Sequence, residues 1–68
     1  MDFVTYVRKK YLADLRAEVQ EKGLRAAVHE RLDEIENICH GHVGMVEYQQ
    51  IVDYLNEIED LMAVANVG

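Results

Sequence analysis

The chain has 68 residues, half of which are hydrophobic, and a formal charge of -6 at pH 7. A chain of this length forms one domain at most and buries only about 60% of the surface that its unfolded form exposes, whereas its apolar content argues against disorder. No apolar run approaches the roughly 18 to 20 residues that span a bilayer, so we expect a soluble protein of the cytoplasm without a membrane partner.

The chain contains no proline, and its four glycines leave few positions at which regular structure can break. This pattern predicts three helices, over about residues 2–22, 24–40 and 45–65, within one domain that covers residues 1–68. The predicted fold class is all-α, either a three-helix bundle or a helical hairpin with an extra amino-terminal helix. Because the core of so short a chain is marginal, we also expect a homodimer.

The first predicted helix has an apolar stripe at steps of three and four residues, formed by Val4, Val7, Tyr11, Leu12, Leu15 and Val19. Asp2 is suited to cap the start of this helix, and Gly23 is suited to end it in a left-handed conformation. The alternative is that Gly23 is tolerated inside one long helix, at a cost of about 1 kcal/mol relative to alanine. The sequence favours the break.

Two aromatic residues, Phe3 and Tyr6, are predicted to lie on the reverse side of the first helix, away from its apolar stripe. Aromatic residues are enriched at protein interfaces. We therefore predict that Phe3 and Tyr6 contact a second subunit or another protein. The alternative is that both side chains pack against the end of their own chain.

The second and third predicted helices each have an apolar stripe. In the second helix it consists of Leu24, Val28, Leu32, Ile35, Ile38 and Cys39, and in the third of Tyr48, Ile51, Leu55, Ile58, Met62 and Ala65. The second set alternates steps of three and four, which is the pattern of a heptad seam that packs against a partner helix. A connection of about four residues favours an antiparallel hairpin of these two helices.

The stretch "ICHGHVGM", residues 38–45, has two interpretations. As a corner, it places Cys39 on the apolar seam, His40 in the last helical turn, and a left-handed Gly41 after it. As a metal site, it offers Cys39, His40 and His42 as ligands for zinc, with a nearby glutamate. Adjacent residues on a helix project about 100° apart, and a second pair of ligands at zinc-finger spacing is missing, so we expect no metal and no cofactor.

The charges are distributed unevenly along the chain. All seven Lys and Arg residues lie between Arg8 and Arg31, whereas residues 32–68 contain eight acidic residues and no Lys or Arg. One interpretation is that basic and acidic helices attract each other within the chain or across a dimer. The other is that Asp53, Glu57 and Asp60, predicted on the outward side of the third helix, steer a basic partner protein.

Catalysis is not expected, because the chain has no serine, a single threonine, and too few residues to enclose a substrate pocket. We predict a small non-enzymatic protein–protein interaction module that acts as a regulator, inhibitor or adaptor, a type of protein that phages also encode. One alternative is a zinc-binding helical protein with its site at residues 39–42. The other is a dimeric nucleic-acid-binding regulator that uses the basic amino-terminal half, which the net negative charge disfavours.

Overall fold

The computed structural model describes residues 2–67, and these residues form three α-helices. Helix α1 spans Phe3–Lys22, α2 spans Leu24–Cys39 and α3 spans Met45–Val67. The all-α prediction is confirmed, since the described residues contain no strand. Each helix begins and ends within two residues of the position expected from the sequence.

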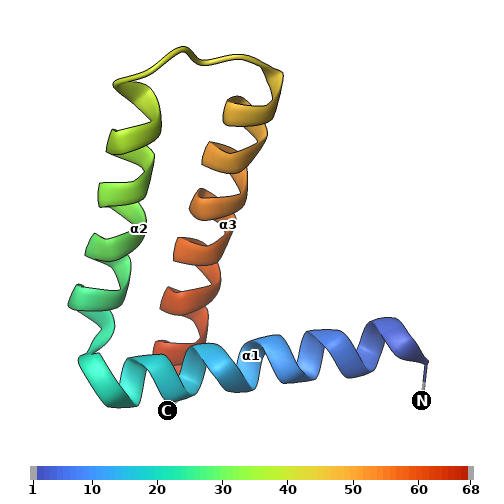
Figure 1. The fold of residues 1–68 in the computed structure, drawn as a ribbon. Helices are drawn as coiled ribbons and strands as arrows, with labels where there is room; N and C mark the ends of the chain where they lie inside the picture. The colour runs from blue at the N-terminus through green and yellow to red at the C-terminus, as the bar shows by residue number, and fades with distance from the viewer. Residues whose placement is uncertain (1, 68) are drawn as a thin grey trace.

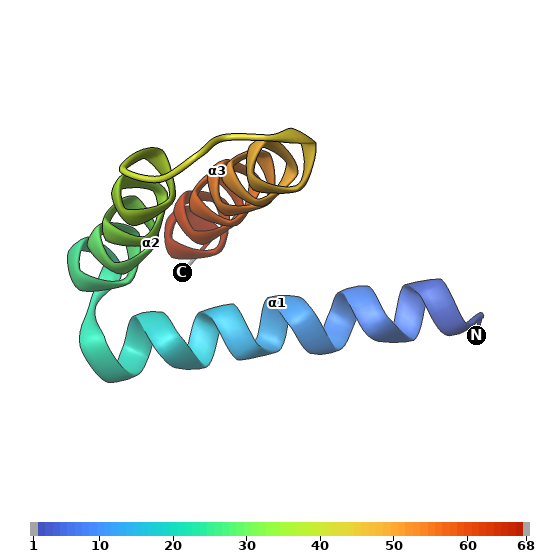
Figure 2. The same ribbon diagram turned by 45° about the horizontal axis from the view of Figure 1, so that its top comes forward.

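Helices α2 and α3 run side by side in opposite directions and form a hairpin, as Figures 1 and 2 show. Helix α1 lies across the open end of this hairpin, on one of its two faces. Helix α3 packs more extensively against α2 than against α1, and α1 and α2 share the fewest contacts. The amino-terminal half of α1 therefore projects beyond the hairpin without another helix beside it (Figure 1).

The break between α1 and α2 is made by a single residue, Gly23. Its φ of 89° and ψ of 153° lie in a region that is essentially restricted to glycine. The Gly23 N–H donates to the Val19 carbonyl at 2.9 Å, and the Gly23 carbonyl accepts from the Ala27 N–H at 3.1 Å. Gly23 thus ends one helix and begins the next, which confirms the predicted break and excludes a continuous helix.

The connection between α2 and α3 satisfies its backbone groups locally. The Gly44 N–H donates to Glu47 Oε1 at 2.9 Å, so the Glu47 side chain caps the first turn of α3. The Gly41 N–H donates to the Ile38 carbonyl at 3.2 Å. The left-handed conformation expected at Gly41 is wrong, because Gly23 is the one glycine with positive φ in the described part of the chain.

The hydrophobic core lies where α1 crosses the hairpin. Its buried members are Leu15, Ala27, Ile58, Leu61 and Val64, and Leu61 is fully buried. The seam expected for α3 is therefore only half correct, because Tyr48, Leu55 and Met62 are exposed. Helix α3 has to face α1 as well as α2, and this second contact turns Leu61 and Val64 inward in place of Leu55 and Met62.

The molecule is thin and expanded for its length. Its dimensions are 39 × 30 × 15 Å, so its shortest dimension is half of the next. Its radius of gyration is 13.5 Å, compared with about 11 Å for a compact domain of this length. The three helices therefore form a plate with a small core.

Candidate interaction surfaces

The first exposed apolar surface lies on the projecting half of α1, residues 3–10, which we call the arm. Every residue of the arm is exposed. Phe3 and Val4 are 78% and 74% exposed, and together with Val7, Arg8 and Tyr11 they line a shallow hollow of about 360 Å³. The arm thus presents an apolar face that no other described residue of the chain covers.

The structure corrects the expected position of Phe3. It shares the hollow with Val4 and Val7, so it does not lie on the reverse side of the helix. Residues at steps of four, here Phe3, Val7 and Tyr11, follow one another along a helix face. Tyr6 is 57% exposed and is not among the residues that line this hollow.

The second exposed apolar surface is a stripe on α3, formed by Tyr48, Leu55 and Met62, which we call the outer stripe. Its members are 63%, 48% and 45% exposed, and their spacing of seven residues keeps them on one side of the helix. On the opposite side of α3, Asp60 accepts a hydrogen bond from Tyr11 of α1. Glu57 accepts one from Arg31, a residue of α2 that also bonds to α1. Leu55 and Met62 stand two positions from these acids, about 160° around the helix, so the outer stripe faces away from α1.

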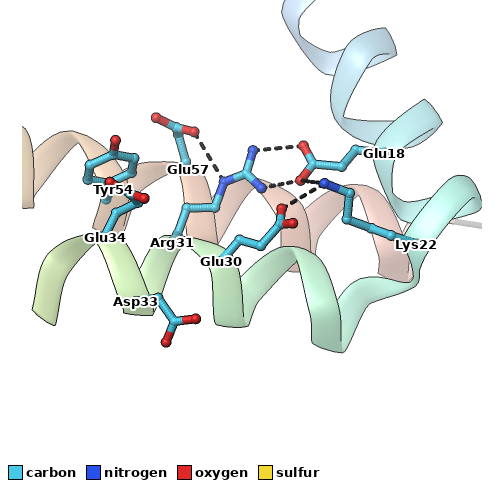
Figure 3. A pocket seen from close by; sticks show the side chains of 8 residues that line it. All are labelled: Glu18, Lys22, Glu30, Arg31, Asp33, Glu34, Tyr54 and Glu57. Atoms are coloured by element: carbon cyan, nitrogen blue, oxygen red, sulfur yellow. Dashed lines mark hydrogen bonds and ion pairs between the residues drawn. The ribbon is translucent and has the colours of Figure 1, made fainter. Parts of the chain in front are cut away.

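The three helices meet at an ionic network centred on Arg31 of α2. The Arg31 guanidinium forms a two-pronged ion pair with Glu18 of α1, in which Nη2 donates to Oε1 at 2.8 Å and Nη1 to Oε2. Its Nε donates to Glu57 Oε1 of α3 at 3.2 Å, and Nη1 also donates to the Ala27 carbonyl at 3.2 Å. Figure 3 shows Arg31 between the two carboxylates. One side chain therefore links all three helices.

A second cation extends this network at the junction of α1 and α2. Lys22 Nζ lies 2.7 Å from Glu30 Oε2 and 3.4 Å from Glu18 Oε2. The Arg31 guanidinium, bonded to both Glu18 oxygens, lowers the pKa of Glu18 below its usual value of 4.5, and Lys22 adds to this effect. The hollow of about 520 Å³ around these residues is rich in carboxylates (Figure 3). Its two cations hold the helices together, which indicates a structural role.

A further polar contact joins the arm end of α1 to α3. The Tyr11 hydroxyl donates to Asp60 Oδ2 at 3.0 Å. Burial, followed by this hydrogen bond to a carboxylate, raises the pKa of Tyr11 to about 12. Folding therefore holds the phenol proton more tightly than the unfolded chain does, where the pKa is 10.0.

We expect the Tyr11→Phe variant to lose about 1 kcal/mol of stability at neutral pH, the usual contribution of one hydrogen bond. The raised pKa stabilises the fold fully below pH 10, and this contribution is lost as the pH rises through about 12. Urea unfolding across that range should show a shallower decline for Tyr11→Phe than for the wild type. Parallel declines would contradict a coupling between the Tyr11 proton and the fold.

The three acidic residues predicted to steer a partner do not share one outward side. Asp53 is exposed and accepts a hydrogen bond from Gln49 Nε2 at 2.9 Å. Glu57 and Asp60 are half-buried, and they bond to Arg31 and Tyr11 within the chain. The outward orientation expected for Glu57 and Asp60 is therefore wrong. The contact of Glu57 with Arg31 agrees with the interpretation that basic and acidic helices attract each other within the chain.

The corner at residues 38–45 does not gather metal ligands. Cys39 is exposed, so its expected packing on the seam is wrong. His40 Nε2 lies 3.6 Å from Glu36 Oε1, and both side chains are largely exposed. Among residues 2–67, no three His, Cys, Asp or Glu side chains converge on a point that would hold a metal ion.

The linking role of Arg31 was not predicted from the sequence, because this residue does not belong to the apolar stripe of α2. The available signal was its position beside that stripe, one residue before Leu32, together with the surplus of acidic residues in α3.

No helix within the described residues is both long enough and apolar enough to cross a bilayer. The sequence matches no model of a protein family, and neither a curated protein nor a solved structure matches the chain.

Proposed function

We propose that this chain is a non-enzymatic protein–protein interaction module of the cytoplasm that works as a homodimer and acts as a regulator, inhibitor or adaptor. The observation that carries the proposal is the arm, whose apolar face lies uncovered on a helix that projects from the fold. An isolated half-helix of this length is marginally stable in water. A covering partner supplies the packing that the arm lacks in a single chain.

The total exposed area supports this proposal. The chain exposes 5204 Å², whereas a folded monomer of its mass exposes about 4,400 Å². The excess is roughly 800 Å², which is the area that each partner typically buries in a specific protein–protein interface. One interface of ordinary size would therefore bring the exposed area down to that of a compact protein.

The chemistry of the exposed surfaces favours binding over catalysis. The hollow on the arm is lined by three apolar residues, one tyrosine and Arg8, and it is open to solvent. The carboxylate-rich hollow contains two cations that are already engaged with carboxylates of the chain. A reaction needs a positioned nucleophile or base beside a pocket that excludes water, whereas an interface needs an apolar patch with a polar rim.

The Val7→Asp variant tests the proposal. Sedimentation equilibrium of the wild type should yield twice the 7.8 kDa mass of the chain. A charge in the centre of the arm face should weaken this association by about 30-fold or more, as expected for loss of a central contact. The helical circular dichroism of the hairpin should persist, because Val7 is 45% exposed and lies outside the core.

Gln20→Asp provides the matched control, since it adds the same charge at an exposed position of α1 beyond the arm. It should leave the association unchanged. A wild-type chain that remains monomeric up to millimolar concentration would contradict the proposed dimer, and equal weakening by both variants would remove the arm from the interface.

A further inference from the structure

We infer that the arm of each chain docks on the outer stripe of a second copy, so that the two subunits of the proposed dimer exchange their arms. This inference rests on the proposed function and names the surface that receives the arm. The chain carries both halves of such a contact. The arm presents Phe3, Val4 and Val7, and the outer stripe presents Tyr48, Leu55 and Met62.

The placement of these two surfaces suits a reciprocal contact. Helix α1 lies against one face of the hairpin, and its arm extends past the edge of the hairpin (Figures 1 and 2). The outer stripe faces away from α1. When a second copy is turned over and placed beside the first, the outer stripe of the second copy lies on the arm of the first. The arm of the second copy then lies on the outer stripe of the first. This arrangement closes under two-fold symmetry and leaves neither surface exposed.

Charge favours the contact of arm with hairpin over the two alternatives, which are arm with arm and hairpin with hairpin. The arm contains Arg8, Lys9 and Lys10 and no acidic residue, which gives a formal charge of +3. The hairpin, residues 24–67, contains nine acidic residues and two arginines, which gives -7. Arm against arm would bring six cations together, and hairpin against hairpin would bring two acidic surfaces together. Arm against hairpin joins opposite charges.

The lengths of the two surfaces are also compatible. The outer stripe extends from Tyr48 to Met62, about 21 Å along the helix, whereas the arm face from Phe3 to Tyr11 covers about 12 Å. Glu59 is exposed, and its position in the helix places it beside Leu55 and Met62. It therefore offers a carboxylate at the rim of the outer stripe for Arg8 or Lys10 of the second copy.

Cross-linking between two different single-cysteine chains tests the exchange. Both chains carry Cys39→Ser. One also carries Val4→Cys, on the arm, and the other carries Val52→Cys, a half-buried position one turn from both Tyr48 and Leu55 at the edge of the outer stripe. Valine and cysteine are both small and apolar, so these changes preserve the surfaces. After mixing and subunit exchange, a short bis-maleimide should produce the mixed 4–52 dimer, identified by mass.

Asp53→Cys in place of Val52→Cys provides the control. Residue 53 is exposed, but it is turned about 100° from residue 52 around α3. The 4–52 product should exceed the 4–53 product by about tenfold. A dimer that yields equal 4–52 and 4–53 products, or only 4–4 or 52–52 products, would overturn arm exchange and leave the proposed dimer intact. A chain that sediments as a monomer would overturn both.

Discussion

The Arg31→Met variant is expected to lose about 2 to 3 kcal/mol of unfolding free energy. Methionine keeps the apolar stem and the helix propensity of arginine, but it leaves the Glu18 and Glu57 carboxylates without their shared cation. The side chains of Arg31 and Glu18 are only 13% and 19% exposed. Removal of one partner from a buried ion pair costs about 3 to 5 kcal/mol, and the partial exposure of this site reduces that value.

This loss is large for a chain whose total stability is about 3 to 10 kcal/mol. Thermal unfolding at a fixed protein concentration should show a decrease in Tm of about 10 to 20 °C. Arg25→Met is the matched control, because Arg25 is an exposed arginine on the same helix. Its effect should stay within about 0.5 kcal/mol. Similar losses in the two variants would show that the network does not hold the helices together.

The same network predicts how stability depends on acid. The pKa of Glu18 is lower in the folded chain than its usual value of 4.5. Glu18 therefore stabilises the fold fully above pH 4.5, and this contribution is lost as the pH falls toward the lowered value. Arg31→Met should make the acid limb of the stability curve shallower. An acid limb with the same slope in the wild type and in Arg31→Met would show that the lowered pKa of Glu18 does not depend on Arg31.

The Gly23→Ala variant is expected to lose about 2 kcal/mol of stability, within the 1 to 3 kcal/mol typical of a side chain forced into such a backbone region. A Cβ at Gly23 would meet no atom within 4 Å, so the cost is conformational and no clash contributes. Equilibrium denaturation with urea measures the loss. The variant also tests whether α1 and α2 straighten into one helix, since its radius of gyration would then increase.

Gly41→Ala is the control for this variant. Its φ is not positive, and a Cβ there would lie 3.8 Å from the Ile38 carbonyl, an ordinary contact. Alanine at such a position leaves stability unchanged or raises it by about 0.4 to 1 kcal/mol. Equal destabilisation by Gly23→Ala and Gly41→Ala would show that the conformation of Gly23 does not account for the loss.

The sequence predicted the helices well because the signals that end a helix are local. Asp2 accepts the Thr5 N–H at 2.8 Å, as expected for a capping residue, and Gly23 separates α1 from α2. These signals depend on a few neighbouring residues, so they can be read without knowledge of the tertiary structure. The all-α class follows from the same signals.

The packing of the helices was not predictable in the same way. The heptad pattern of α3 does not state that α1 crosses on a second side, and this crossing decides that Leu61 is buried while Leu55 is exposed. The point at which α1 crosses also decides how much of it projects as the arm. The same crossing explains the role of Arg31. This charged residue lies beside the apolar stripe of α2, and it can join α1 to α2 only because the crossing brings Glu18 within reach of its guanidinium.

The single-residue junction at Gly23 makes α1 a lever. The arm tip at Phe3 lies about 30 Å along the helix from this pivot, whereas Glu18 lies about 7.5 Å from it. A rotation of 10° about Gly23 would therefore move Glu18 by about 1.3 Å and Phe3 by about 5 Å. Glu18 and its ion pair with Arg31 lie on the same side of the pivot as Phe3, but four times nearer to it. A small displacement of Glu18 about this pivot would therefore be about four times larger at the arm tip.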